Sequence, residues 1–253
     1  MSDAERPHGP GPAPSIPDLQ RKLRTSQRLN VALAAMAVFL LVVIVTQQVA
    51  TPGSTGGAVT PSSNAAGQTM AEKVARAQAD DPMAWGDPKA PVVIVQWTDF
   101  RCPFCAAFAK DTLPTLFTQY IDTGKVRFEL HDAALFGDQS VDAAVAARAA
   151  GAQGKYHEFM TALYAAAPDS GHPDLPKETL IGFAKTAGVP DMTAFAAALD
   201  DPALRKQVTD ATASAQKLGV NSVPFFVVGN QVVNGAQPLM NFQSAIETEL
   251  AKK

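Results

Sequence analysis

The chain has 253 residues, enough for one or two domains, with 47% apolar residues, 18% charged residues and a formal net charge of −3. This composition excludes a chain that is disordered throughout, and a charge so close to zero gives no reason to expect nucleic-acid binding. Because the chain has only two cysteines, a disulfide-dense scaffold and a metal site of four thiolates are also excluded.

The first 50 residues combine a basic segment with an apolar one. Residues 7–17 contain five prolines and two glycines, and four basic residues lie between 21 and 28, so we expect 1–28 to be a disordered cytoplasmic segment. Residues 29–50 carry no charge, and as a helix they would be about 30 Å long, the thickness of a bilayer core. The basic flank predicts a single transmembrane anchor with its N-terminus in the cytoplasm.

A cleaved signal peptide and a buried soluble helix are the alternatives for this apolar segment. The leader before it is long, and the apolar run exceeds the usual length of a signal-peptide core, roughly 7–15 residues. We therefore favour an uncleaved anchor, although the sequence leaves cleavage open. Both membrane interpretations export everything after residue 50, so we expect an extracytoplasmic domain on a single-pass cell-membrane protein.

Residues 51–69 have the composition of a flexible linker. They carry no charge, and 13 of these 19 residues are Gly, Pro, Ser or Thr, which bury too little apolar surface to offset the entropy of ordering. The folded domain is therefore expected over 70–253, a length sufficient for one hydrophobic core.

Hydrophobic patterns predict an α/β domain interrupted by helices. The β-branched run 92–97 predicts a buried strand, 103–120 has helical spacing, and 126–130 alternates like a second strand, which together form a βαβ unit. Helical patterns divided by Gly and Pro follow over 140–218 and predict four or five helices.

The C-terminal part predicts a return to the sheet. A hairpin is expected over 224–233, with its turn at Gly229-Asn230, and a last amphipathic helix over 239–250. The predicted fold class is thus an α/β sheet with a helical block inserted between its halves, at about 138–219.

Both cysteines fall in one tetrapeptide, Cys102-Pro103-Phe104-Cys105, between the predicted strand and helix. This spacing at a helix start brings two sulfurs close enough to bridge, and the unpaired amides there favour a thiolate at Cys102. Pro103 suits the first turn, where its missing donor costs nothing. The pattern predicts reversible dithiol–disulfide chemistry, with Cys102 as the nucleophile and Cys105 as the shielded resolving thiol.

Two other interpretations of the cysteine pair are weaker. A zinc site needs two further ligands, and no other cysteine exists and the histidines show no paired spacing. Two inert buried thiols would fall three residues apart at a strand–helix junction only by chance. We therefore expect no metal.

The segment 98–105 resembles the active-site region of DsbA-like proteins of the thioredoxin superfamily, and 219–227 resembles their second motif. Residues 151–159 are similar to their inserted helical domain and 235–238 to the approach to the last helix, so the resemblance covers roughly 82–250. It implies a thioredoxin-like fold with a helical insertion, a cis bond before Pro224, and substrate contacts from Val223 and Pro224. The implied activity is thiol–disulfide exchange with the Cys102–Cys105 disulfide as the only redox group.

One position departs from the family. Many relatives carry a buried acid six residues before the first cysteine, where this chain has Gln96, which cannot titrate. Asp99 is expected in a surface turn and Glu129 is expected to point to solvent, so neither is assigned that role. His131-Asp132 is interpreted as a solvated strand end.

Hydrogen-bond donors to Cys102 are expected from the helix start and from the loop before Pro224. The side chain of Phe104 has no donor to offer. Trp97, Phe100 and Phe108 are expected to be packing residues.

The predicted function is oxidation of cysteine pairs in exported proteins by a membrane-anchored, monomeric oxidoreductase. A quinone-linked membrane protein would reoxidise it, as the resemblance implies. A reductant or an isomerase of the same compartment is the main alternative. Relatives that handle small aromatic or glutathione-linked substrates form a further enzyme class, and a non-catalytic peptide-binding module is more remote.

Overall fold

The computed structural model describes residues 67–253. The predicted cytoplasmic segment, the membrane anchor and nearly all of the linker lie outside the described residues. Among the helices of 67–253, none combines the length and the apolar character needed to cross a membrane.

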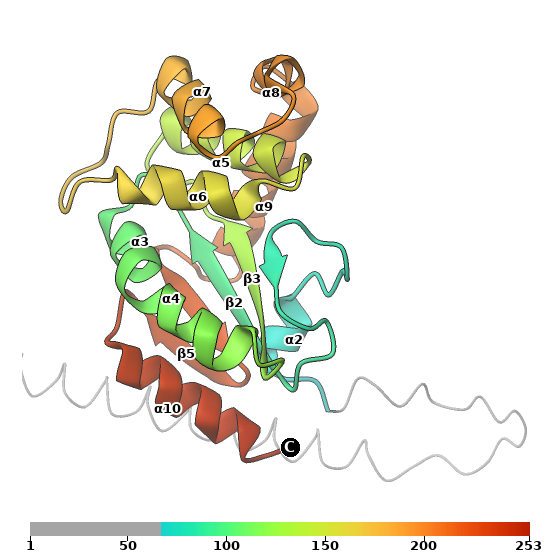
Figure 1. Cartoon of the computed structure of the whole chain (residues 1–253). Coiled ribbons are helices and arrows are strands. Elements are labelled where there is room, and N and C mark those ends of the chain that lie inside the picture. The colour runs from blue at the N-terminus through green and yellow to red at the C-terminus, as the bar shows by residue number, and fades with distance from the viewer. Residues whose placement is uncertain (1–66) are drawn as a thin grey trace, which may run out of the picture. The chain divides into compact units, whose positions relative to one another are not determined.

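A five-stranded sheet in the order β1-β3-β2-β4-β5 forms the centre of the domain (Figure 1). Strands β2 (Val92–Thr98) and β3 (Val126–Asp132) pair in parallel, as the βαβ prediction requires. Strand β4 (Phe225–Val228) runs antiparallel to β2, and β5 (Gln231–Asn234) completes the predicted hairpin. The short strand β1 (Ala84–Trp85), which was not predicted, lies antiparallel to β3.

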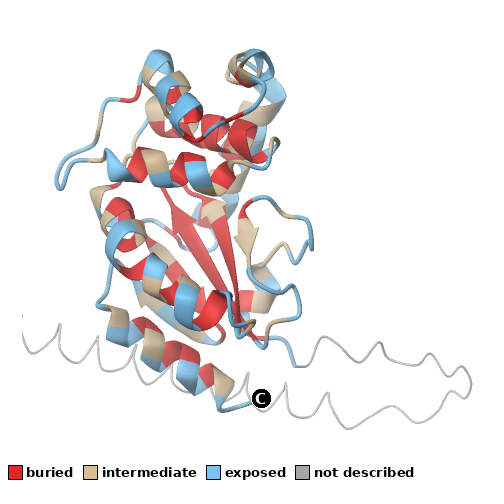
Figure 2. Cartoon of the chain, viewed as in Figure 1, coloured by how far each residue is buried: buried red, intermediate tan, exposed pale blue. Residues whose placement is uncertain are grey.

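The two central strands are buried on both faces (Figure 2). For β2 this agrees with the β-branched run of its sequence. For β3 it overturns the expectation of one solvent-facing side, because every residue of the strand except His131 is fully buried. Helix α2 (Met70–Val74) was also not predicted. It contacts β2 and β4 and so helps to cover the sheet.

One continuous helical stretch follows β2, close to the predicted limits. It consists of α3 (Pro103–Ala107), the π-helical turn η1 (Phe108–Thr112), α4 (Leu113–Leu116) and a second π-helical turn, η2 (Phe117–Ile121). Phe108 anchors this stretch on the sheet, since its ring centroid lies 4.5 Å from that of Phe226 and 5.1 Å from that of Phe242.

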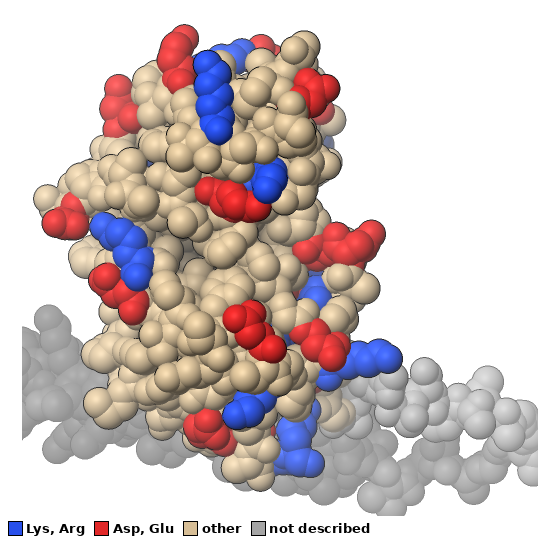
Figure 3. Space-filling model, in the orientation of Figure 1, with Lys and Arg blue, Asp and Glu red and all other residues tan. Residues whose placement is uncertain are grey.

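Five helices between β3 and β4 confirm the predicted helical block, which lies above the sheet in Figure 1. They are α5 (Asp138–Gly151), α6 (Tyr156–Ala165), α7 (Lys177–Thr186), α8 (Met192–Ala198) and α9 (Pro202–Lys217). The last predicted helix is α10 (Leu239–Leu250), which packs against the sheet through Phe242. On the face shown in Figure 3, acidic and basic side chains are interspersed, with no patch of one sign.

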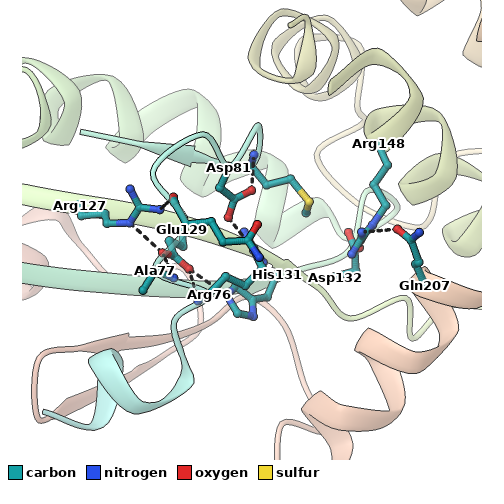
Figure 4. A network of polar contacts seen from close by, with 11 residues as sticks. Arg76, Ala77, Asp81, Arg127, Glu129, His131, Asp132, Arg148 and Gln207 are labelled. Atoms are coloured by element: carbon teal, nitrogen blue, oxygen red, sulfur yellow. Dashed lines mark hydrogen bonds and ion pairs between the residues drawn. The ribbon is translucent and has the colours of Figure 1, made fainter. Parts of the chain in front are cut away.

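The expectation for Glu129 was wrong, because its side chain is 0% exposed. Its carboxylate accepts hydrogen bonds from Arg127 Nε at 2.8 Å and from the backbone amides of Arg76 and Ala77 at 2.8 and 3.1 Å (Figure 4). The chain between 75 and 81 thus covers the face on which solvent was expected.

The end of β3 is not solvated either. Asp132 is buried and pairs with Arg148 of α5, whose Nε donates to it at 2.6 Å. His131 lies against Trp97, with 5.5 Å between ring centroids, and its Nε2 is 3.4 Å from Glu129. Asp132 therefore has its partner in the helical insertion, and His131 has its partners in the sheet.

Candidate active site

Antiparallel pairing of β2 and β4 brings the two halves of the site together. Trp97 near the end of β2 lies opposite Phe225 at the start of β4. The loop that leaves β2 and the loop that enters β4 therefore meet at the same edge of the sheet. As a result, Cys102 lies beside Val223, although 121 residues separate them.

Cys102 is the N-cap residue of α3, and Pro103 follows in the first turn. Its backbone is extended, and its sulfur accepts a hydrogen bond from the amide of Cys105 at 3.4 Å. This amide is one of the donors that a helix start leaves without a backbone partner, so it is available to a thiolate. Both cysteines are free thiols here, and both are buried.

The pKa of Cys102 is lowered from its ordinary value. The largest cause is a hydrogen bond from the Cys105 thiol, and the backbone amides of Cys105 and Phe104 act in the same direction. Burial opposes this effect, and so does the negative charge of Asp99. The helix start and the second thiol together outweigh these two effects and favour the thiolate.

Cys105 has the opposite environment. It is 0% exposed, and burial raises its pKa well above the ordinary value. The hydrogen bond to Cys102 and the charge on Cys102 raise it further, whereas the Asp99 backbone and the Thr98 hydroxyl act to lower it. Within one tetrapeptide, the structure therefore provides an ionisable thiol and a protected one.

The peptide bond between Val223 and Pro224 is cis, as the resemblance implies. The loop before Pro224, however, does not present the donor expected from the sequence. Cys102 Sγ donates to the carbonyl oxygen of Val223 at 3.4 Å, so this contact favours the protonated thiol rather than the thiolate. The donors to the thiolate are the Cys105 thiol and the helix-start amides of Phe104 and Cys105.

A hollow of about 550 Å³ opens beside Cys102, and its wall is mostly apolar. Phe104, 65% exposed, stands on one side, while Phe136 and His172 lie on another with ring centroids 4.0 Å apart. Val223 completes the wall. The arrangement leaves room for an extended peptide next to the nucleophilic sulfur.

Asp99 lies in the turn before Cys102, but it is buried, contrary to expectation. Its carboxylate accepts hydrogen bonds from the amides of Arg101 at 2.8 Å, Leu135 at 2.7 Å and Phe136 at 3.2 Å. The first is the ordinary contact of an aspartate turn, and the others tie that turn to the segment after β3. Burial raises the pKa of Asp99 despite these donors.

Arg101 extends the same connection to the loop between α6 and α7. Its guanidinium donates to the carbonyl oxygens of Pro173 at 2.8 Å and Phe136 at 2.6 Å. His172 Nδ1 lies 2.9 Å from the carbonyl oxygen of Arg101. The loop that carries Cys102 is therefore hydrogen-bonded to two other segments. One follows β3 and contains Phe136, and the other lies between α6 and α7 and contains His172 and Pro173.

The structure brings the sequence-predicted residues together at one edge of the sheet: Cys102, Pro103, Phe104, Cys105, Val223 and Pro224. Trp97, Phe100 and Phe108 are buried packing residues, as expected. Sequence reasoning missed Arg101 and His172, whose only local signal is their nearness to the motif or to a Gly-His-Pro turn.

Comparisons with known proteins agree with this geometry. A family model described as thioredoxin matches residues 78–248. Disulfide bond formation protein D of Bacillus subtilis is 25% identical over 170 residues, which cover 66% of this chain and 77% of that protein.

Solved structures give the same result. Oxidised BdbD from Bacillus subtilis is similar with a TM-score of 0.63 at 25% identity, covering 68% of this chain and 94% of that one. Wolbachia pipientis α-DsbA1 has a TM-score of 0.60 at 22% identity, covering 67% and 91%, which supports the fold. With its cysteine pair at a helix start and its helical insertion, the chain belongs to the thioredoxin family and is a DsbA-like thiol–disulfide oxidoreductase.

Proposed function

We propose that this oxidoreductase introduces disulfides into exported proteins, with Cys102 as the nucleophile and Cys105 as the resolving thiol. The observation that carries the proposal is the lowered pKa of Cys102 beside a protected Cys105. A thiolate that is stabilised in the reduced form raises the reduction potential, so the protein gives up its disulfide readily. The name of the Bacillus subtilis relative supports the same direction.

In the forward reaction, a substrate thiolate attacks Cys102 in the Cys102–Cys105 disulfide. The Cys102–Cys105 bond breaks, and Cys105 leaves as a thiolate that takes up a proton. A second substrate thiolate then attacks the substrate sulfur of the mixed disulfide, and Cys102 leaves as a thiolate. The substrate is oxidised by two electrons and the cysteine pair is reduced, with no bound cofactor required.

The open side of the site supports this role for Val223 and Pro224. Their loop forms one wall of the hollow beside Cys102, where an extended substrate would add to the backbone as a strand. Phe104 offers an apolar surface at the same place.

Oxidised glutathione tests the assignment of the two thiols. We expect the Cys105→Ser protein to accumulate a mixed disulfide between Cys102 and glutathione, because the resolving thiol is gone. The Cys102→Ser protein should form almost none, because Cys105 is 0% exposed and burial raises its pKa well above the ordinary value. Accumulation in the second variant and not in the first would reverse the assignment.

Equilibration of the unaltered protein with glutathione tests the direction. An oxidase should have a reduction potential well above that of thioredoxin, about −270 mV. A value at or below it would assign the protein to the reductants.

We further propose that the domain lies outside the cytoplasm, tethered by an anchor at 29–50, and that a quinone-linked membrane oxidoreductase reoxidises Cys102 and Cys105. The uncharged apolar segment and its basic flank support this topology. A membrane-impermeant thiol reagent should label Cys102 in intact, mildly reduced cells. Labelling that appears only after lysis would contradict the topology.

A further inference from the structure

Resolution of a mixed disulfide at Cys102 requires a thiolate at Cys105, yet this thiol is buried and its pKa is strongly raised. Gln96, at the position where relatives carry an acid, is itself buried and cannot exchange a proton. Glu129 is committed to Arg127 and to two backbone amides. Some other group must therefore stabilise the Cys105 thiolate while it forms.

Two buried hydroxyls are linked to Cys105: the Thr98 hydroxyl favours its thiolate, and Tyr164 is sensitive to its charge. The Tyr164 hydroxyl, from α6 of the helical insertion, is 2.8 Å from the Thr98 hydroxyl at the end of β2. It also lies 3.3 Å from the carbonyl oxygen of Asp99. The Tyr164 ring stacks on Phe100, with 5.4 Å between centroids, which fixes the direction of the hydroxyl.

We propose that Tyr164 is a positioning residue for the resolving step, which holds the Thr98 hydroxyl so that it donates a hydrogen bond to the Cys105 thiolate. This inference rests on the proposed role of Cys105 as the resolving thiol. It assigns a part in the chemistry to the helical insertion, which supplies no cysteine.

Because Tyr164 has two hydrogen-bond partners, the hydroxyl pair can respond to both protonation states of Cys105. While Cys105 is a thiol, Tyr164 donates to the carbonyl of Asp99, and Thr98 donates to Tyr164. When Cys105 ionises, Tyr164 turns its proton to Thr98, 2.8 Å away, and the Thr98 hydroxyl becomes free to donate to the sulfur. Burial raises the pKa of Tyr164 well above its usual range, so this hydroxyl remains a neutral donor.

The titratable groups that act on this site are few. Cys102 on the same turn raises the pKa of Cys105, and the charge of Cys105, across the interface with α6, raises that of Tyr164. Tyr156, on the same helix as Tyr164, acts on the Tyr164 pKa in the same direction. The Asp99 charge acts on Cys102 and on Tyr164. Thr98 is the one side chain among the leading influences on Cys105 that favours its thiolate.

The step balances without a resident base. The Cys105 proton passes to water, the Cys105 sulfur attacks Cys102, and the bond between Cys102 and the substrate sulfur breaks. The substrate leaves as a thiolate that takes a proton from water. In the reverse direction, the same hydroxyls stabilise Cys105 as the leaving group.

Rapid mixing of the reduced protein with oxidised glutathione, followed by acid quenching and mass spectrometry, separates the two steps. The mixed disulfide at Cys102 reports the attack, and its decay to the Cys102–Cys105 disulfide reports the resolution. We expect Tyr164→Phe to leave the attack rate unchanged and to slow resolution at neutral pH by about tenfold, the worth of one hydrogen bond to a charged group. The pH profile of resolution should move to higher pH.

Tyr156→Phe is the matched control. Tyr156 lies on the same helix and is equally buried, and its hydroxyl has no hydrogen-bond partner among the described residues. This variant should resolve the mixed disulfide at the wild-type rate. Thr98→Val should slow resolution as Tyr164→Phe does, and the double variant should be no slower than Thr98→Val alone, because Tyr164 acts through Thr98.

Three results would overturn the inference: an unchanged pH profile in Tyr164→Phe, equal slowing of attack and resolution, or equal slowing in Tyr156→Phe. If the unaltered protein forms no mixed disulfide at Cys102, the proposed function itself fails. The two failures are thus distinguishable. Urea unfolding of each variant identifies any loss of rate that comes from a loss of fold.

Discussion

Glu129 allows a quantitative prediction, because its side chain is fully buried and opposing effects act on its charge. Burial alone would raise the pKa of Glu129, but hydrogen bonds from His131, Arg127 and the amide of Arg76 lower it from 4.5 to about 2. We predict that Glu129→Gln destabilises the domain at neutral pH and removes part of its sensitivity to acid.

The magnitude follows from linkage. A carboxyl group whose pKa is lower in the folded than in the unfolded protein stabilises the fold above the unfolded value of 4.5. That contribution disappears as the pH falls from 4.5 to about 2. A pKa difference of this size corresponds to about 3 kcal/mol, and leaving Arg127 buried without its partner costs about the same.

Urea unfolding between about pH 7 and about pH 3 provides the measurement, with the lower end extrapolated along the linkage curve. The free energy of unfolding of Glu129→Gln should lie about 3 kcal/mol below that of the unaltered protein at neutral pH, and the two should converge in acid. His131 also loses a stabilising contribution in acid, because burial lowers its pKa, but that loss begins near its ordinary value of 6.5.

Glu158→Gln makes the same chemical change at an exposed ion pair. Glu158 lies 2.8 Å from Lys155, and its side chain is 45% exposed, so we expect a loss below about 1 kcal/mol. Parallel pH curves for Glu129→Gln and the unaltered protein would refute the reasoning about Glu129. So would a loss in Glu129→Gln no larger than that in Glu158→Gln.

The remaining predictions concern the pKa of Cys102, followed by the ultraviolet absorbance of its thiolate, and the equilibrium with glutathione. Cys105→Ala should raise this pKa more than Cys105→Ser, because a serine hydroxyl can still donate to the sulfur. Asp99→Asn should lower it and make the protein more oxidising, because a buried negative charge is removed; a rise would contradict this. Phe104→His should act in the same direction as Asp99→Asn, because residue 104 is exposed and its imidazole can donate to the thiolate; an unchanged potential would contradict this.

Features that depend on neighbouring residues could be predicted from the sequence. The β-branched run predicted β2, and the Gly229-Asn230 turn predicted the hairpin of β4 and β5. The cysteine spacing predicted the start of α3 and the reactive pair. In each case the pattern and its physical cause lie within one element.

The errors share a different origin. Alternation in β3 shows that one face is apolar, but it does not show whether the other face is covered by a distant segment. Here residues 75–81 cover it, and the Glu129 carboxylate accepts hydrogen bonds from two backbone amides and from Arg127 instead of from water. Asp99 is misjudged for the same reason, since its turn is local but Leu135 and Phe136 lie more than 30 residues away.

The direction of electron flow depends on contacts that the cysteine motif does not contain. The Cys105 thiol and the helix-start amides favour the Cys102 thiolate, and they come with the motif itself. The Val223 carbonyl and the Asp99 charge oppose it, and they come from a loop 121 residues away and from the turn before the helix. Since about 30 mV corresponds to about 1.4 kcal/mol for two electrons, one such contact shifts the reduction potential by only part of the roughly 150 mV that separates thioredoxin from DsbA, and several contacts together set the direction. The Asp99 carboxylate can be replaced without altering the cysteine pair, whereas the Val223 oxygen belongs to the backbone and depends on the position of its loop.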